Sequence, residues 1–185
     1  MIEGESMEHK RPSVMHIAET THLDKDGNLL WSAQDIDNIL HDEGEIAILS
    51  AYFATTMTGY GAPPANLYLG LDARSTLAEA DTLASLATEP STTAGYARVA
   101  LATAEAGSSG EDFYINQPAA YYRADSATAT FTASGAAWGA VKNLFLCTVA
   151  SGSTGKLLCS LALTADRTLQ DGDSLNTSMY TGLSE

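Results

Sequence analysis

The sequence predicts a mainly β protein, a jelly-roll-like antiparallel β-sandwich with an extended N-terminal arm and one or two short helices. From Asn66 onward, apolar residues alternate with polar or small ones, which is the pattern of strands buried on one face. Short turns rich in Gly and Ser separate about eight such segments. By contrast, apolar residues are sparse and without a clear period at the start of the chain.

Residues 1–45 are predicted to form the arm, and residues 46–185 the sandwich domain. The sequence DKDGN at 24–28 is a strong turn signal, so we expect a small hairpin or an extended hook there. A segment with so few apolar residues cannot build a core of its own, and we expect a partner surface to order it. The residues that would anchor it directly follow the turn: Leu29, Leu30 and Trp31.

Two helical segments are predicted before the first strand. A short turn over 35–40, capped by Ser32 or Asp35, would present Ile36, Ile39 and Leu40. A longer helix is predicted over about 46–57, because apolar residues recur there on one helical face, namely Ile46, Leu49 and Phe53. The sequence GYGAPP at 59–64 ends this helix.

Strands are predicted from Asn66 to Leu71 and then over 96–104, 111–116, 120–124, 126–134, 140–150, 156–164 and 176–183. The strongest pairing joins 140–150 to 156–164 through the turn SGSTG. Centring that turn on Ser153 places Cys147 opposite Cys159 and makes one face wholly apolar. The other pairs are then Phe145 with Leu161 and Val149 with Leu157. Buried free thiols are favoured over a disulfide for the two cysteines.

The long connection at 76–99 interrupts this series of strands. Its first half, 76–86, has helical spacing and is expected to cover one open end of the sandwich with Leu77, Leu83 and Leu86. Pro90 and Gly95 then redirect the chain toward the next strand. Two interpretations stay open, because long loops often carry contacts. The segment either packs on a neighbouring subunit, with Arg74 or Arg98 paired to a carboxylate, or is an internal lid.

Composition and charge exclude several classes of function. The net charge is −14, with nine basic residues, which argues against binding nucleic acid or an anionic membrane. No apolar run reaches the length of a membrane span, and we expect no secretory signal. With only two cysteines, the sequence favours folding in a reducing cytoplasm.

Catalytic and metal-binding patterns are weak, so we expect no enzyme activity, no cofactor and no metal site. The four histidines are His9, His16, His22 and His41. A histidine-based triad inside the sandwich would therefore require the arm to fold back. The loop at 24–28 begins like a calcium loop, but Leu29 stands where the essential glycine belongs. Acidic residues that could act in glycoside hydrolysis, Glu79, Asp81 and Glu89, are better explained as solvated side chains.

Aromatic residues on the strands leave sugar binding open as an alternative. The residues concerned are Tyr114, Tyr121, Tyr122, Trp138 and Tyr180. Such residues more often belong to a core or an interface, and a sugar site requires an exposed aromatic patch.

Two stretches, NILHDEGEIAILSAYF at 38–53 and LYLGLDARSTLAEADTLASLATEPSTTAGYARV at 67–99, resemble small structural proteins of tailed bacteriophages. The later segments WGAVKNLFLCT, KLLCSLAL and RTLQDGDSL are also similar, so the resemblance spans residues 22–183. It implies a jelly-roll-like domain with an N-terminal arm, present in many copies in the virion. Head decoration (cement) proteins and tail or fibre components are both found among such proteins.

We therefore expect a virion structural protein made in the host cytoplasm, namely a capsid decoration protein that binds the major capsid protein as a trimer and stabilises the shell. The alternatives are a tail or fibre component that binds host surface polysaccharide, and a hydrolytic enzyme. The predicted capsid- or subunit-contact residues are Leu29, Leu30, Trp31, Ile36, Ile39, Leu40, Arg74 and Arg98.

Overall fold

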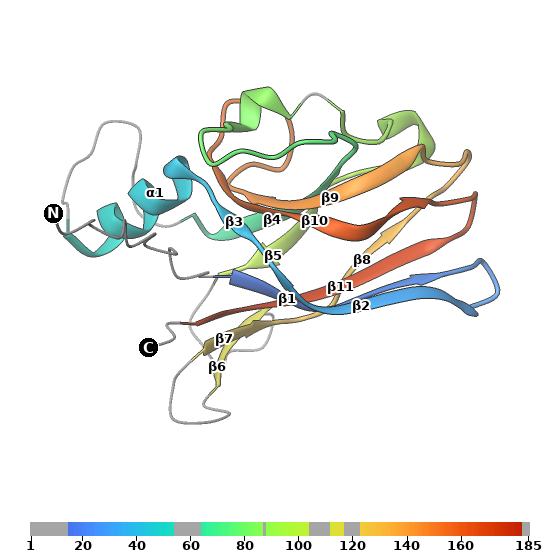
Figure 1. Ribbon diagram of the computed structural model, residues 1–185, viewed down its shortest axis with the longest axis horizontal. Helices are drawn as coiled ribbons and strands as arrows, with labels where there is room; N and C mark the ends of the chain where they lie inside the picture. The colour runs from blue at the N-terminus through green and yellow to red at the C-terminus, as the bar shows by residue number, and fades with distance from the viewer. Residues whose placement is uncertain (1–14, 54–63, 87, 104–111, 117–122, 183–185) are drawn as a thin grey trace, which may run out of the picture.

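Two antiparallel β-sheets stack on each other in the computed structural model, with an α-helix at one end of the stack (Figure 1). The structure describes residues 15–53, 64–86, 88–103, 112–116 and 123–182. The prediction of a mainly β antiparallel sandwich is confirmed.

The first sheet, called sheet A, has the strand order β2-β1-β11-β7-β6, and β8 also pairs with β11. Its strands are β1 (Met15–Leu23), β2 (Leu29–Asp37), β6 (Phe113–Asn116), β7 (Arg123–Ser126), β8 (Ala129–Thr132) and β11 (Ser174–Gly182). The edge strands of sheet A are thus β2 and β6, together with β8, which pairs only with β11.

The second sheet, sheet B, has the strand order β3-β10-β9-β4-β5. Its strands are β3 (Ile39–Leu40), β4 (Asn66–Asp72), β5 (Val99–Ala102), β9 (Ala140–Cys147) and β10 (Leu157–Thr168). The helix α1 (Asp42–Phe53) follows β3. Two single-turn 3-10 helices, η1 (Leu83–Ser85) and η2 (Thr92–Ala94), lie in the connection from β4 to β5.

The main core lies between the two sheets. Sheet B contributes alternate residues of its strands, such as Leu69 and Leu71 on β4 and Leu144 and Leu146 on β9. Sheet A contributes Ile17, Phe131, Leu175 and Met179. Each of these large side chains gains about 1.5–3 kcal/mol from full burial, so this layer supplies most of the driving force for folding.

The prediction of an N-terminal arm is wrong for residues 15–45. Strand β1 lies inside sheet A and pairs with β11 from Met15–Thr181 to Leu23–Ser174. Two of its inward positions hold polar residues with buried partners. The Thr20 hydroxyl bonds the Thr177 hydroxyl at 2.9 Å, and His22 Nε2 lies 3.2 Å from Asp173 Oδ2. These polar residues hide the alternation that would have indicated a strand. Residues 1–14 lie outside the described residues.

The turn predicted at 24–28 is confirmed, because Gly27 N donates to Asp24 O and Asp24 N to Asn28 O. The helical turn predicted over 35–40 is wrong. That stretch ends β2 and forms β3, and it carries the chain from the edge of sheet A to the edge of sheet B. Within β2, Asp35 has a positive φ of 50°, a backbone conformation that is irregular for a strand.

The predicted helix is present but begins earlier, at Asp42, and is described as far as Phe53. Gly44 allows α1 to approach β10 closely. A Cβ at this position would collide with the backbone oxygen of Leu158, so a glycine is required where the helix meets the strand.

The hairpin of β9 and β10 is confirmed, but its predicted register is wrong. Leu157 pairs with Cys147, and after a bulge Cys159 pairs with Leu146. The bulge adds one residue to β10, which a symmetric turn cannot anticipate. The two cysteines therefore point to opposite faces of sheet B, and both are buried and free as predicted.

Candidate interaction surfaces

The outer face of sheet B, which points away from sheet A, is covered by the connection from β4 to β5. We call the described residues of this connection, 73–86 and 88–98, the lid. Figure 1 shows the lid along the side of sheet B that faces away from sheet A. It contains η1 and η2 but no longer helix, so the helix predicted over 76–86 is wrong.

Beneath the lid lies a second apolar cluster. Leu83 and Leu86 come from the lid, and they pack with Phe145, Cys147 and Leu157 from sheet B. The ring of Phe145 lies across the paired residue Gly70, where a Cβ would overlap it. The lid thus covers a sheet face and not an open end of the sandwich. Leu83 and Leu86 are buried as predicted, while Leu77 is only half-buried.

Arg98 fastens the far end of the lid to sheet B. Its Nε donates to Glu89 at 3.0 Å, and its two terminal nitrogens reach the carbonyl oxygens of Val149 at 3.0 Å and Gly152 at 2.9 Å. Its guanidinium lies 5.2 Å from the ring centre of Phe145. Because burial raises the pKa of Tyr96, this phenol stays protonated and donates to Glu89 at 2.7 Å.

A second ionic cluster fastens the near end. Arg74 Nε lies 3.1 Å from the fully buried carboxylate of Asp72, and its Nη2 lies 3.0 Å from Asp81. The amide of Asn143 also donates to Asp72, and the hydroxyl of Thr88 donates to it too. Burial alone would raise the pKa of Asp81, but the hydrogen bonds from Arg74, Ala78 and Ser85 and the charge of Arg74 together outweigh it and lower this pKa.

Both predicted contact arginines therefore bind carboxylates of their own chain. Arg98 is 8% exposed and fully engaged beneath the lid. This geometry is that of the internal lid, the second of the two interpretations that the sequence left open.

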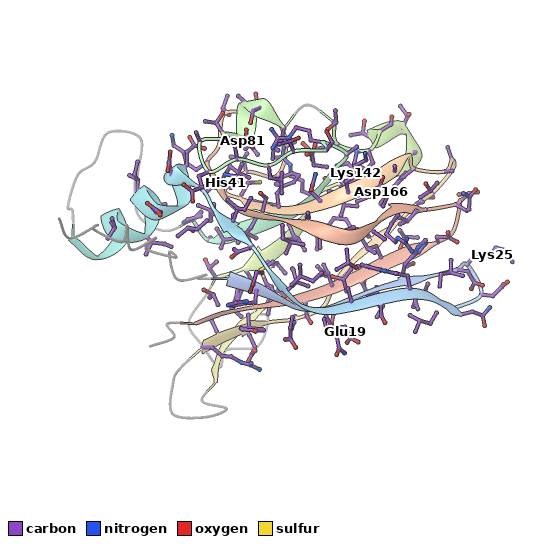
Figure 2. All side chains as sticks on the ribbon, in the orientation of Figure 1. Glu19, Lys25, His41, Asp81, Lys142 and Asp166 are labelled. Atoms are coloured by element: carbon purple, nitrogen blue, oxygen red, sulfur yellow. The ribbon has the colours of Figure 1, made fainter. Side chains whose placement is uncertain are left out.

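His41 approaches a serine because the N-terminal segment does fold back on the sandwich. His41 Nε2 lies 2.7 Å from Ser160 Oγ, and Nδ1 lies 3.1 Å from the main-chain oxygen of Glu79. Nδ1 therefore holds the proton, and Nε2 accepts from the serine. Burial lowers the pKa of His41, which keeps the ring neutral. Figure 2 shows His41 near Asp81 under the lid.

This serine–histidine pair lacks the surroundings of a catalytic site. Ser160 is 1% exposed, and a main-chain oxygen occupies the position where a triad has its carboxylate. Two of the carboxylates considered for glycoside hydrolysis, Asp81 and Glu89, are paired with arginines. Among the described residues, no three His, Cys, Asp or Glu side chains are grouped to bind a metal ion. In the same part of the chain, no helix is both long and apolar enough to cross a membrane.

The outer face of sheet A is polar. Its exposed side chains hydrogen-bond along the surface, as Gln34 does with Glu19 at 3.4 Å and Thr130 with Asn176 at 2.8 Å. Figure 2 shows Glu19 on the side of β1 and β2 that faces away from sheet B. No described segment lies over this face as the lid lies over sheet B.

One row of planar side chains crosses sheet A from β1 to β7. The ring of His16 stacks on Tyr180 at 4.9 Å, and Arg123 lies 4.6 Å from the Tyr180 ring centre on the other side. Both ring faces of Tyr180 are therefore covered. Trp138, another candidate for sugar stacking, is buried and donates to Ala94 O at 2.7 Å. The side chains of Tyr114, Tyr121 and Tyr122 lie outside the described residues.

Exposed large hydrophobic residues, within the described part of the chain, lie at the two ends of the molecule. Leu29 and Leu30, 59% and 54% exposed, follow the hairpin turn between β1 and β2. Ile48 and Leu49, 41% and 55% exposed, belong to α1. Figure 1 places the hairpin turn and α1 at opposite ends of the longest axis.

The other predicted contact residues are partly buried against their own chain. Trp31 lies beneath Arg167, at 4.9 Å from its guanidinium, and Ile36 packs on the main core. Ile39 and Leu40 are half-buried in β3. Of the predicted set, Leu29 and Leu30 remain available for a partner. Ile48 and Leu49 were not predicted, because a one-faced helix pattern places Leu49 toward the core.

Comparison with protein families places this sandwich among the structural proteins of bacteriophage virions. The family model described as Podophage GP4 fiber I protein gp80 matches residues 40–182, and the chain belongs to that family. No curated protein matches the chain, and no solved structure matches it. The predicted resemblance to phage structural proteins is thereby confirmed at the level of a virion structural protein.

Proposed function

We propose that the protein is a component of a podophage fibre and acts through contacts with other proteins. The observation that carries this proposal is the family match, which includes all of sheet B except Ile39, all of α1 and every strand of sheet A after β2. The fibre alternative thus takes precedence over the capsid decoration protein that the sequence favoured. In a fibre, the protein is still a virion component, as the sequence predicted, but it belongs to a fibre and not to the head surface.

We further propose that this role involves no catalysis and no cofactor. Polar side chains of the kinds that act in catalysis, such as Ser160, Arg98 and Asp72, are buried here and held in internal hydrogen bonds. Copies of the same chain and neighbouring virion proteins are the proposed partners. The net charge of −14 disfavours nucleic acid and anionic membranes as partners.

Binding of host polysaccharide is not part of this proposal. Sugar rings bind by stacking on open aromatic faces, whereas both faces of Tyr180 are covered by His16 and Arg123. Among the aromatic side chains that the structure describes on the outer face of sheet A, Tyr180 therefore offers no open ring face for stacking.

The test is to locate and count the protein in purified virions. Gold-labelled antibodies should mark fibres, and quantitative mass spectrometry should find far fewer copies than of the major capsid protein. Labelling spread over the head, with a copy number comparable to that of the major capsid protein, would contradict the fibre role and support capsid decoration.

A further inference from the structure

The first two strands, β1 and β2, form a separate piece of sheet A, which we call the β1–β2 hairpin. The two strands pair with each other along their length, and the chain then reaches β3 through Asn38 alone (Figure 1). The hairpin also precedes residue 40, where the match to the fibre family begins. We propose that this hairpin leaves its own sandwich and occupies the same place on a second copy, so that two copies exchange hairpins.

The turn of the hairpin is held by contacts within the hairpin itself. Asp24 Oδ1 accepts from the main-chain nitrogens of Asp26 at 2.9 Å and Asn28 at 2.8 Å. Gly27, with φ of 83°, completes the turn. Because none of these bonds reaches the rest of the sandwich, detachment of the hairpin leaves them in place. The turn also fixes the register of β1 against β2, so the hairpin docks again in the same arrangement.

On the other side of Asn38, the chain is fastened to sheet B. Strand β3 pairs with β10, and His41 N donates to Leu158 O at 3.0 Å. The ring of His41 bonds Ser160 at 2.7 Å. The hinge is therefore short, and in the monomer it has to turn between the two sheets. In an exchanged pair the hinge runs on to the neighbour instead, and short hinges are known to favour this form.

The side of β11 that a detached hairpin exposes is specific for β1. It carries two buried polar side chains: the Thr177 hydroxyl, which bonds Thr20 at 2.9 Å, and Asp173, which lies 3.2 Å from His22 Nε2. An apolar strand placed here would bury this hydroxyl and this carboxylate without partners, which is unfavourable. The β1 strand of another copy brings a threonine and a histidine at the required spacing. A second copy of this chain is thus the partner that fits.

The ends of the hairpin also find the same contacts on a second copy. Lys25 lies against Gly172, where a Cβ would come within 2.9 Å of the Lys25 Cβ, and Trp31 lies beneath Arg167. The closed and the exchanged forms therefore share their contacts and differ at the hinge. Association also costs entropy, so dilute protein favours the monomer, and high concentration favours exchange. This inference does not depend on the fibre role.

The direct test is a disulfide between copies across the pairing of β1 with β11. Thr21 lies opposite Asn176 on β11 and opposite Ser32 on β2. The full-length variants Thr21→Cys and Asn176→Cys are mixed in urea, refolded together with reductant at high protein concentration, and then mildly oxidised. Once the chains are folded, the native cysteines react slowly, because burial raises the pKa of Cys147 and raises that of Cys159 to about 12.

Exchange should link positions 21 and 176 of different copies, with a yield that rises with protein concentration. The matched control is Thr21→Cys with Ser32→Cys, because these two positions are neighbours within one hairpin and stay apart between copies. We expect several times more linked dimer from the first mixture. Equal yields from the two mixtures at every concentration would overturn the proposal.

The double variant Thr21→Cys with Asn176→Cys shows whether this pair can be linked at all. In dilute solution it should form the disulfide within one chain, since the two residues are paired in the monomer. A double variant that stays reduced would remove the pairing on which the proposal rests.

A longer hinge gives a second test. Insertion of Gly-Ser-Gly after Asn38 should favour the monomer and lower the yield of the link between 21 and 176 several-fold. The same insertion after Ser153, in the exposed turn between β9 and β10, is the control and should leave the yield unchanged. Equal yields with the two insertions would overturn the role of the hinge. These measurements use purified protein, so their failure is distinguishable from failure of the fibre role.

Discussion

The two outer faces of the sandwich are built differently. The outer face of sheet B lies under the lid, with its own apolar cluster and two arginine–carboxylate clusters. The outer face of sheet A carries hydroxyl and amide side chains that face solvent. Strand β9 is buried from Asn143 to Cys147 without interruption, which is typical of a strand covered on both faces. A long connection thus acts here as a third layer of the fold.

This difference between the faces shows that three of the chain's few basic residues stabilise the covered side of the sandwich. Arg74, Arg98 and Lys156 fix the lid and α1 to sheet B. These basic side chains hold the fold together, although the sequence alone suggested that Arg74 and Arg98 contact a neighbouring subunit. Surfaces for partners should be sought on sheet A and at the two ends.

The largest contrast between the faces is expected from Phe145→Ala and Thr130→Ala. Removing the Phe145 ring opens a cavity beneath the lid and should cost about 3–5 kcal/mol in the free energy of unfolding. Thr130 is exposed, so its truncation should change stability by less than about 0.5 kcal/mol. Urea denaturation measures both. Equal losses for the two variants would show that the faces do not differ as described.

The next effect concerns the arginine that fastens the lid. Arg98→Met removes the ionic partner of Glu89. It also leaves the Val149 oxygen with only the weak Cys147 thiol donor and takes the Arg98 donor from the Gly152 oxygen. Because Glu89 is partly exposed, we expect a loss of about 2–3 kcal/mol, below the range for a fully buried pair.

A double-mutant cycle with Glu89→Gln should show coupling between the two side chains, and Arg167→Met serves as a control at a more exposed arginine. A loss no greater than that of the control would mean that the lid does not depend on Arg98.

A smaller effect is expected where sheet B meets the Phe145 ring. Gly70→Ala places a methyl group into that ring and should cost about 1–3 kcal/mol through overpacking. Gly139→Ala is the matched control, because a Cβ there meets no atom within 4 Å. Thermal unfolding measures the midpoint temperature of each variant. If both substitutions lowered that temperature equally, the close approach of the Phe145 ring to β4 would be contradicted.

The smallest effect is a pH dependence from His41 under the lid. Its pKa in the folded protein lies below the unfolded value of about 6.5, so the unfolded chain binds more protons below that pH. Stability should therefore be unaffected by this group above pH 6.5. It should fall as the pH drops from 6.5 toward the folded pKa, by up to about 1.4 kcal/mol per pH unit.

His41→Gln cannot take up this proton, so the stability difference between the wild type and the variant should shrink between pH 7.5 and 5.5. A difference that is constant over this range would show that His41 ionises alike in both states.

Much of the fold could be predicted because several strands from β4 onward have alternating sequences, as with Leu67, Leu69 and Leu71 in β4 and Ala129 and Phe131 in β8. Strand β1 could not be predicted, because Thr20 and His22 occupy inward positions and their partners Thr177 and Asp173 lie more than 150 residues away. The carboxylates that pair with Arg74 and Arg98 could not be predicted either, because the sequence does not show which acidic residues the lid places beside these arginines. Leu29 and Leu30, which directly follow a clear turn signal, are exposed, and their contact with a partner stays a prediction.

The central claim is that the lid seals the outer face of sheet B, while the two ends of the molecule remain available to partners. Hydroxyl-radical footprinting of the free protein and of intact virions tests it most directly. We predict that Leu29, Leu30, Ile48 and Leu49 become protected in the virion, while Leu83, Phe145 and Leu157 beneath the lid are equally protected in both. The account would be contradicted if the end residues reacted equally in both samples, or if the residues beneath the lid were protected only in the virion.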